Sequence, residues 1–322
     1  MNKKGITALV FLTLLIFTSS VFIGPKLIDP FRMDKVAREI IISIRLPRII
    51  ISILVGAALG SSGAILQGML RNPLADPYIL GLSSGSALMA VVSLLFDNIF
   101  FGLFTLPMLA FLGAIAAGAA VGALGQKKGN LLPERLLLAG VGLGFLFSAV
   151  LMLVMSLSTD EGLRRATFWL FGDLSMADWT LIPYGIAFIL LGFGLSLWRA
   201  KALNALMLGD EVAYSLGFSP SKERWVLFLA VGLMTASSVS LGGVVGFIGL
   251  LVPHIIRSFI GADNRILIPM SALAGGALLC AADTIGRTVV APTELPAGVI
   301  TAIIGAPYFL YLLKKKDLLG VS

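Results

Sequence analysis

The chain has 322 residues, of which 58% are hydrophobic and only 13% are charged, with a net charge of +7. A soluble domain carries roughly 25% charged residues, so most of this surface has no need to face water. The single cysteine, Cys280, excludes an internal disulfide framework, and the single histidine, His254, argues against a histidine-based metal site. The composition predicts an all-α integral membrane protein with no metal site and no nucleic-acid partner.

Apolar runs free of Asp, Glu, Lys and Arg follow one another along the whole chain. Each is long enough for the roughly 20 helical residues that cross a bilayer core. The run 225–256 is too long for one span, and its glycines predict a tight turn near Gly242 and Gly243. Dividing it there gives ten expected spans: Gly5–Pro25, Ile49–Leu70, Pro77–Phe96, Asn98–Gln126, Leu136–Thr159, Trp179–Trp198, Trp225–Leu241, Val245–Ile260, Ile266–Ala282 and Leu295–Leu313.

The first apolar run has one feature of a secretory signal peptide, because Lys3 and Lys4 precede it. However, Ile6–Ile23 is longer than the apolar core of a typical signal peptide, and no Ala-x-Ala cleavage site follows it. These features favour a retained membrane span.

Basic residues indicate how the spans are oriented, since cytoplasmic connections are enriched in Lys and Arg. With both termini in the cytoplasm, the inner segments hold fifteen of the 24 basic and seven of the 17 acidic residues. Nine spans would place the basic tail Lys314–Lys316 outside, so this rule also favours ten. The first outer loop is an exception that suggests an acidic partner outside, because it contains Lys26, Arg32, Lys35, Arg38, Arg45 and Arg48.

The longest inner connection, Arg199–Arg224, is where we expect a cytoplasmic partner to dock. Residues 202–208 and 209–217 each favour a short helix; Asp210 can cap the second, and Gly217 can end it in a left-handed conformation. The chain contains no Gly-Lys dipeptide and hence no phosphate-binding P-loop, so an ATPase would have to be another subunit. An interfacial helix pair with no partner is the alternative interpretation of this loop.

Ten spans that are nearly free of ionisable residues restrict the function. Membrane enzymes and proton-coupled carriers place ionisable side chains within the bilayer, and Asp283, at a helix end, is the clearest such residue here. No internal repeat supports a twofold secondary carrier. An ATP-driven permease is the leading hypothesis, and a secondary transporter or channel independent of ATP is the alternative.

Five segments in order along residues 45–313 carry a resemblance to a known family. They are Arg45-Leu46-Pro47-Arg48, RNPLADP from Arg71 with Gly81 and Ser84-Gly85, the segment from Leu208 to Gly217, GFIGLLVPHIIR from Gly246, and ELPAG from Glu294 with Gly305-Ala306-Pro307. On these motifs the chain resembles the FecCD/BtuC-like family of ABC (ATP-binding cassette) importer permeases, which serve the uptake of iron-siderophores, haem and vitamin B12.

The resemblance implies the type II ABC importer permease fold, with ten transmembrane helices in a single domain, 1–322. It implies a homodimer in the bacterial cytoplasmic (inner) membrane, with two ATP-binding subunits that hold ATP and Mg²⁺ on the cytoplasmic side. A periplasmic substrate-binding protein would deliver a metal-chelate substrate for alternating access. The permease would bind no cofactor and would not be an enzyme. Whether the substrate is cobalamin, haem or a ferric siderophore stays open.

The resemblance also implies roles for individual residues. ATPase coupling through the helices at 202–217 would involve Leu208, Gly209, Asp210, Glu211, Ala213, Leu216 and Gly217. Docking of the binding protein would use the outer-face residues Arg45, Arg48 and Arg287. The cytoplasmic gate would comprise Asn72, Leu74, Pro133 and Glu134, of which Glu134 departs from the small hydroxyl residues of the vitamin B12 permease. The translocation path would include Ser84, Gly140, Gly144 and Met152.

Several of these features also have a structural explanation. The glycines Gly140 and Gly144 equally favour close packing of helices. His254 follows Pro253, and we expect it to hydrogen-bond a carbonyl that the proline frees, rather than to bind iron or haem. By resemblance, a short outer helix is expected over 163–176, with Trp169 and Trp179 suited to the membrane interface.

Overall fold

The computed structural model describes residues 3–31, 33–95 and 101–314. Lys315 and Lys316 of the expected inner tail, and Phe96 and Asn98 at the expected ends of two spans, lie outside the described residues. Within them the chain is almost entirely helical, and the two short strands β1 (Gln126–Lys127) and β2 (Asn130–Leu131) pair as an antiparallel hairpin. The all-α fold class is confirmed.

Seven helices among the described residues are long and apolar enough to cross a membrane, and three shorter apolar helices accompany them. Together they match the ten expected spans: α1 (Lys3–Phe22), α3 (Leu46–Met69), α4 (Leu82–Leu95), α5 (Thr105–Gly125), α6 (Pro133–Ser156), α8 (Ile182–Trp198), α11 (Pro220–Gly242), α12 (Ile248–Ile260), α13 (Asn264–Gly286) and α14 (Ala297–Lys314). The other helical segments are α2 (Lys35–Glu39), the π-helical η1 (Ile40–Arg45), η2 (Gly102–Phe104), α7 (Asp160–Leu170), η3 (Trp179–Leu181), α9 (Ala200–Leu208) and α10 (Asp210–Ser215).

The glycine turn that was predicted to divide the longest apolar run is confirmed. Helix α11 ends at Gly242, and Gly243 follows with a positive φ of 66°. A Cβ on Gly243 would lie 2.2 Å from the carbonyl oxygen of Trp169, so a side chain would be excluded by contact as well as by conformation.

Two outer segments differ from the sequence prediction. The first outer loop is helical from Lys35 onward, because the Asp34 carboxylate caps α2 by accepting a hydrogen bond from Ala37 N at 2.6 Å, and α2, η1 and α3 then follow without a break. The short outer helix α7 spans 160–170 instead of 163–176, because the Thr159 hydroxyl caps its start.

The two outer tryptophans also lie in different surroundings. Trp179 is exposed, and its indole Nε1 donates a hydrogen bond to the carbonyl of Ile42 at 2.9 Å. Trp169 is buried in a small core cluster, so the prediction of an interfacial position is wrong for this residue. Helix α7 therefore packs inward, which sequence hydropathy did not predict.

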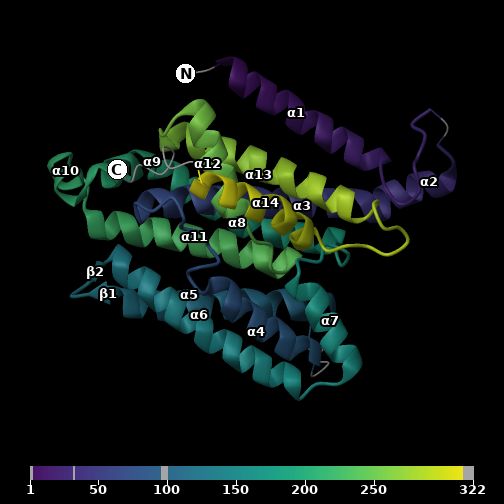
Figure 1. Ribbon diagram of the computed structural model, residues 1–322, viewed down its shortest axis with the longest axis horizontal. Coiled ribbons are helices and arrows are strands. Elements are labelled where there is room, and N and C mark those ends of the chain that lie inside the picture. Colours follow the sequence, from purple (N-terminus) through teal and green to yellow (C-terminus); the bar gives the residue numbers. More distant parts are fainter. Residues whose placement is uncertain (1–2, 32, 96–100, 315–322) are drawn as a thin grey trace.

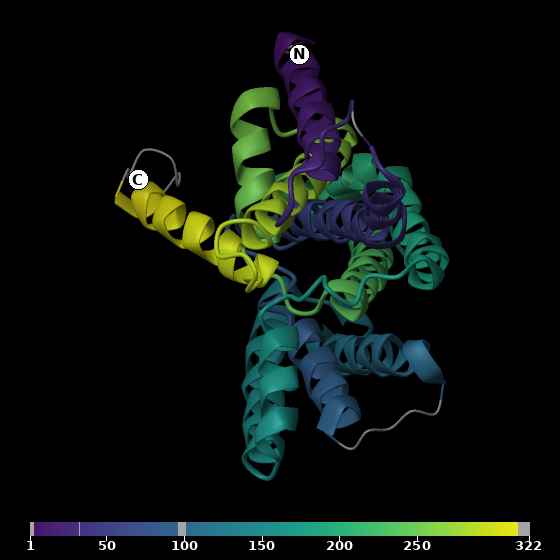
Figure 2. The same ribbon diagram turned by 90° about the vertical axis from the view of Figure 1, so that its right-hand side faces the viewer.

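Helix α3 is the centre of the bundle, and α13, α11 and α12 pack along it (Figure 2). Its side chains Ile51, Ile65 and Leu66 are fully buried. A Cβ on Gly56 of α3 would lie 2.2 Å from the Gly275 carbonyl oxygen of α13, so this pair of glycines lets the two backbones touch.

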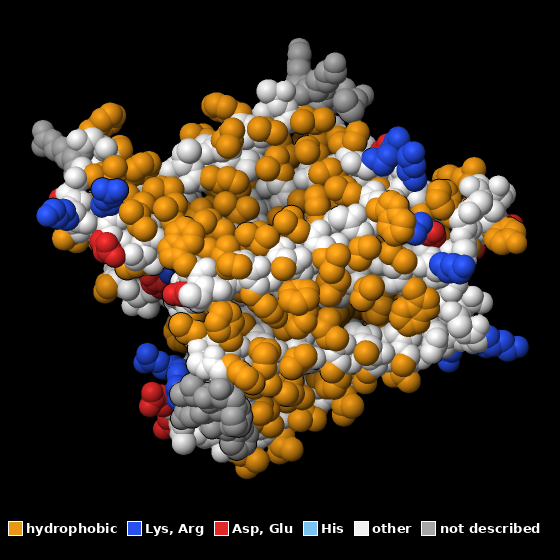
Figure 3. Space-filling view, turned by 180° about the vertical axis from the view of Figure 1, so that it is seen from behind, with side chains coloured by type: hydrophobic (Ala, Val, Ile, Leu, Met, Phe, Trp, Pro, Cys, Tyr) orange, Lys and Arg blue, Asp and Glu red, His pale blue; other side chains and the backbone are white. Residues whose placement is uncertain are grey.

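The molecule has two distinct ends. In Figure 1, α9, α10 and the β-hairpin lie at the left end, whereas α2 and α7 lie at the right end. The start of α1 and the end of α14 are both toward the left end, as an even number of spans requires. Hydrophobic side chains cover the middle of the surface and charged ones gather toward its two ends (Figure 3). This belt is the surface expected of a chain embedded in lipid.

Candidate functional site

Helices α9 and α10 form the surface that the sequence assigned to coupling. Gly209, with φ of 122°, joins them, and Gly217, with φ of 85°, ends the second one. The predicted left-handed stop at Gly217 is confirmed, with Phe218 N donating to Ala213 O at 3.0 Å across it. Ala213 is fully buried and anchors α10.

The outward face of this pair is apolar. Leu208 is 70% exposed, Tyr214 77% and Leu216 60%, all at the end of the molecule that carries the hairpin. Glu211 is also exposed. Such a cluster of large apolar side chains beside charged ones is typical of a protein interaction site.

The predicted capping role of Asp210 is wrong. Gly209 holds the N-cap position of α10, and no side chain makes the capping hydrogen bond there. The Asp210 carboxylate instead pairs with the buried guanidinium of Arg224 and lies 3.5 Å from Arg71. Its hydrogen bond from Arg224 holds the pKa of Asp210 below its usual range, so the carboxylate is charged at neutral pH. Asp210 thus connects α10 to the start of α11 and to the segment after α3.

Three of the four predicted gate residues lie together. Asn72, Pro133 and Glu134 line a polar cavity of about 500 Å³ that also includes Asp210 and Arg224. The gate position after α3 therefore lies directly against the coupling helix α10. Glu134 is exposed at the first turn of α6, where its negative charge is favourable.

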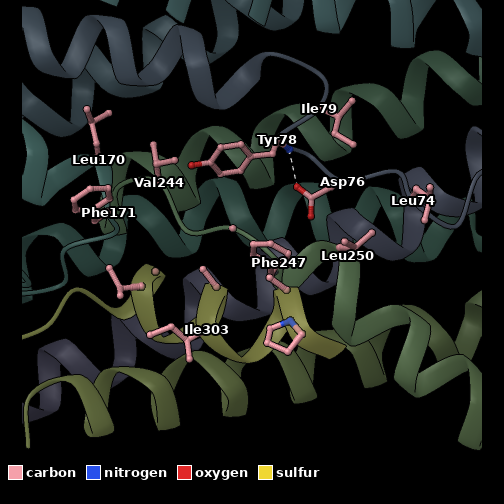
Figure 4. Close-up of a pocket in the computed structure, with 16 residues that line it drawn as sticks. Leu74, Asp76, Tyr78, Ile79, Leu170, Phe171, Val244, Phe247, Leu250 and Ile303 are labelled. Atoms are coloured by element: carbon pink, nitrogen blue, oxygen red, sulfur yellow. Dashed lines mark hydrogen bonds between the residues drawn. The ribbon is translucent and has the colours of Figure 1, made fainter. Parts of the chain in front are cut away.

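The fourth predicted gate residue, Leu74, lines a second and larger cavity. This cavity of about 860 Å³ is almost wholly apolar, and segment 74–79, the start of α12 and one face of α14 enclose it. In Figure 4, Tyr78, Phe247 and Ile303 project into the space from these different elements. Asn72 shapes the approach to it, because its side-chain oxygen accepts a hydrogen bond from Leu74 N at 2.9 Å.

The predicted path residues do not form one continuous surface. Gly140 is buried, and a Cβ there would lie 2.8 Å from the Ile79 carbonyl oxygen, which supports close packing as its role. Gly144 is half-buried, and a Cβ on it would lie 3.7 Å from the Ser84 hydroxyl of α4. Met152, in contrast, is 70% exposed on the outside of α6.

The three predicted docking arginines are buried, with exposed fractions of 3% for Arg45, 7% for Arg48 and 3% for Arg287. Arg48 makes a bidentate pair with Asp283 at 2.8–3.0 Å and a second pair with Glu294 at 2.6 Å. None of the three is therefore a free cation on the surface. Their docking role stays a prediction. It would require the three arginines to become partly exposed when the binding protein docks.

Backbone carbonyls hold the other two arginines. Arg45 donates to Val21 O and Lys26 O at 2.8 and 2.5 Å, and Arg287 donates to Ser20 O at 2.5 Å. They thereby fix the end of α1 against α3 and α13. Sequence reasoning noted Asp283 as an unusual acid but missed its partner; a lone acid in an apolar span was itself the signal that a buried cation must lie nearby.

The expected hydrogen bond from His254 is replaced by one from α3. Pro253 has no N–H, so the carbonyl of Gly249, four residues earlier, lacks its helical donor. The Gln67 side chain supplies it, with Nε2 lying 3.2 Å from Gly249 O and 3.1 Å from Leu250 O. The sequence analysis was therefore right that a carbonyl lacks its helical donor, but wrong about the residue that supplies one.

Comparison with known proteins identifies the family. The profile of the FecCD transport family matches residues 6–315. The chain belongs to the FecCD transport family. The hemin transport system permease protein of Yersinia pestis is 41% identical, over 85% of this chain and 83% of its own length. The iron(3+)-hydroxamate import system permease protein of Bacillus subtilis is 38% identical over 95% of each chain, and the cobalamin import system permease protein of Halobacterium salinarum is 40% identical over 89% of this chain and 76% of its own length.

A solved structure supports the same assignment for this FecCD protein. It is described as a metal-chelate type ABC transporter in an inward-facing conformation. It superposes with a TM-score of 0.89 and 32% identity, covering 97% of this chain and 99% of its own. The protein is therefore a multi-pass membrane protein and a permease subunit of an ABC importer.

Proposed function

We propose that this permease moves a metal-chelate substrate, of the ferric siderophore, haem or cobalamin class, as a homodimer with two separate ATP-binding subunits. The observation that carries the proposal is the apolar outward face of Leu208, Tyr214 and Leu216, next to the cavity lined by Asn72 and Glu134. A cytoplasmic ATPase docked on this face would act directly on the gate. ATP and Mg²⁺ would be held by the ATPase, and this single domain, 1–322, would supply the path.

The lining and the volume of the larger cavity fit the proposed substrate. Its lining is apolar and aromatic, as expected of a path that must let a bulky chelate slide without tight binding. Its volume of about 860 Å³ in one subunit is within the range of small-molecule sites. A path on the axis of a dimer would be wider still.

A homodimer is supported by the open face of α6. Leu138, Phe145 and Met152 are 76%, 74% and 70% exposed and recur every seven residues, so they lie on one stripe of the helix. In the proposed dimer this stripe would face the second copy or the path between the copies. Both chain ends would lie in the cytoplasm, and a periplasmic binding protein would dock over α2, α7 and the Arg48 cluster.

The test is reconstitution of the complex with its ATPase subunits and its periplasmic binding protein in liposomes. ATP hydrolysis is measured with haem, ferric hydroxamate and cobalamin supplied in turn on the outside. We expect one of the three to stimulate hydrolysis and to accumulate inside only when ATP is present. Uptake driven by an ion gradient without ATP would contradict the proposal and favour a secondary carrier.

A further inference from the structure

Two groups of buried polar side chains hold the opposite ends of α12. One group holds its start against the segment 70–81, which contains the predicted gate residues Asn72 and Leu74, and the other ties its end to the coupling helix α9. A helix of 13 residues spans about 20 Å at 1.5 Å per residue, so α12 connects the gate segment to the turn before α13.

At the gate end, Asp76 and Gln67 hold the first turn of α12 from two sides. The Asp76 carboxylate accepts a hydrogen bond from Tyr78 N at 2.8 Å within its own segment (Figure 4), and it lies against the first turn of α12 at Gly249. Gln67 supplies the donor that Pro253 removed from the Gly249 carbonyl. The carboxylate thus lies at the start of α12, where a helix has free amides, and the Gln67 amide group satisfies a free carbonyl.

The contact at this end is tight as well as polar. A Cβ on Gly249 would lie 2.8 Å from Pro77 and 3.0 Å from the Asp76 carboxylate, and a Cβ on Gly63 of α3 would lie 1.9 Å from the Gly249 carbonyl oxygen. Asp76 itself is only 8% exposed. Segment 70–81 therefore has no room to shift without either moving α12 or breaking these bonds.

At the other end, Asn204 of α9 holds the turn between α12 and α13. Its Nδ2 donates to Asp263 Oδ1 at 2.8 Å, and its Oδ1 accepts from Asn264 N and Nδ2 at 2.9 and 2.7 Å. Asn264 is fully buried. One donor and the acceptor of the Asn204 amide group thus bond to this one turn, which fixes α9 to the end of α12.

The other polar link between the coupling helices and the gate segment is weaker. Arg71 and Asp210 are 3.5 Å apart, and both side chains are close to half exposed. An exposed ion pair contributes little to stability, because water competes for both side chains. The buried hydrogen bonds at the two ends of α12 are the firmer connection.

We propose that α12 is a rigid link that carries movement of α9 to the gate segment 70–81, with Asp76 and Gln67 as the positioning residues at the gate and Asn204 at the coupling helix. The inference rests on the proposed function, in that it takes α9 and α10 as the place where the ATPase acts. When α9 moves, Asn204 displaces the end of α12, and the first turn of the helix displaces Asp76 and the gate with it.

The test measures the gate response without needing the cargo. The sole native cysteine is removed by Cys280→Ser, and Leu74→Cys, at a position 37% exposed, reports gate opening by its rate of reaction with a water-soluble maleimide. The complex with its ATPase subunits is labelled with and without Mg-ATP and vanadate. Asp76→Asn, Gln67→Leu and Asn204→Ala are each introduced into this parent.

We expect the parent to change its labelling rate when nucleotide is trapped, and each variant to lose that change while its complex still hydrolyses ATP. The double variant with Asp76→Asn and Asn204→Ala should behave like either single one, because both break the same link. Asp178→Asn is the matched control: its carboxylate accepts from Thr180 N at 2.8 Å in the same local geometry, far from α12, and should leave the change intact.

Full nucleotide-dependent labelling in Asp76→Asn and Asn204→Ala would overturn the rigid link while leaving the proposed function in place. A parent that shows no nucleotide response would instead count against the coupling role of α9 and α10. If Asp76→Asn does not assemble, Asn204→Ala decides, since Asn204 is half-buried at the cytoplasmic edge and its loss removes no charge.

Discussion

Arg48 and Asp283 form a deeply buried ion pair at the end of the bundle that carries α2, with side-chain exposures of 9% and 2%. Replacing Asp283 by leucine would leave two buried guanidinium groups, Arg48 and Arg287, and among the described residues Glu294 is the remaining acid that pairs with either. Removing one partner of a buried pair destabilises a protein by about 3 kcal/mol or more. We therefore expect Asp283→Leu to lower the thermal unfolding midpoint of the purified permease clearly.

The control for this prediction is an exposed pair. Arg265→Met breaks the bidentate pair with Asp263, in which the arginine side chain is 58% exposed, and should shift the midpoint far less. The double variant Arg48→Met with Asp283→Leu should recover much of the loss, because it removes a charge of each sign. Equal shifts of the unfolding midpoint for Asp283→Leu and Arg265→Met would mean that the buried pair stabilises the protein no more than the exposed pair does.

The same residues mark what sequence could and could not predict at this scale. Arg45, Arg48 and Arg287 were singled out by the family resemblance as docking residues, and that role stays a prediction. Their partners were not, because Arg48 and Asp283 are 235 residues apart and only the packing of α13 on α3 brings them together. Asp210 was likewise placed on the right helix but assigned the wrong contact. A capping pattern involves residues that are close in the sequence, whereas Arg224 is 14 residues away.

At the scale of single elements, Gly217 ends α10 with φ of 85° in open space. A β-branched residue there has no neighbour to clash with, so its penalty is the left-handed backbone itself, roughly 1–2 kcal/mol. We expect Gly217→Val to unwind the end of α10 and to uncouple transport from ATP hydrolysis, measured as the ratio of substrate imported to ATP consumed in liposomes.

A glycine in the β-hairpin provides the control for Gly217→Val. Gly129 has φ of 81° and also has nothing within 4 Å of an added Cβ, so Gly129→Val introduces similar strain at the same end of the molecule. This variant should keep the wild-type ratio of import to hydrolysis. An equal loss in both variants would attribute the effect to general damage instead of to α10.

The helix boundaries agree with hydropathy for the spans, whose length the bilayer sets. They differ from it where a capping residue sets the start of a helix. The ten spans were predictable because each must cover the same apolar thickness. The helical segment from Lys35 and the early start of α7 were not, because the caps Asp34 and Thr159 start these helices. Burial of Trp169 likewise depends on contacts with distant elements.

At the scale of the whole molecule, ten spans require the coupling helices and the first outer loop to lie on opposite sides of the membrane. Tyr214 and Phe31 are 77% and 93% exposed and occupy these two places. The excess of Lys and Arg in the segments assigned to the inside predicts the orientation. In a background with Cys280→Ser, we expect Phe31→Cys to react with a membrane-impermeant maleimide added outside intact cells, and Tyr214→Cys to react only after the cells are opened.

The two labels together test the arrangement, because either one alone could fail through local shielding. Both positions protrude from their neighbours, so each should react fast once the reagent reaches its side. Gly129→Cys, in the hairpin, should follow Tyr214→Cys, since the connections after α5 and after α8 face the same way when the spans alternate. Reaction of Phe31→Cys and Tyr214→Cys from the same side would contradict the odd number of spans between them, and with it the placement of the ATPase under α10.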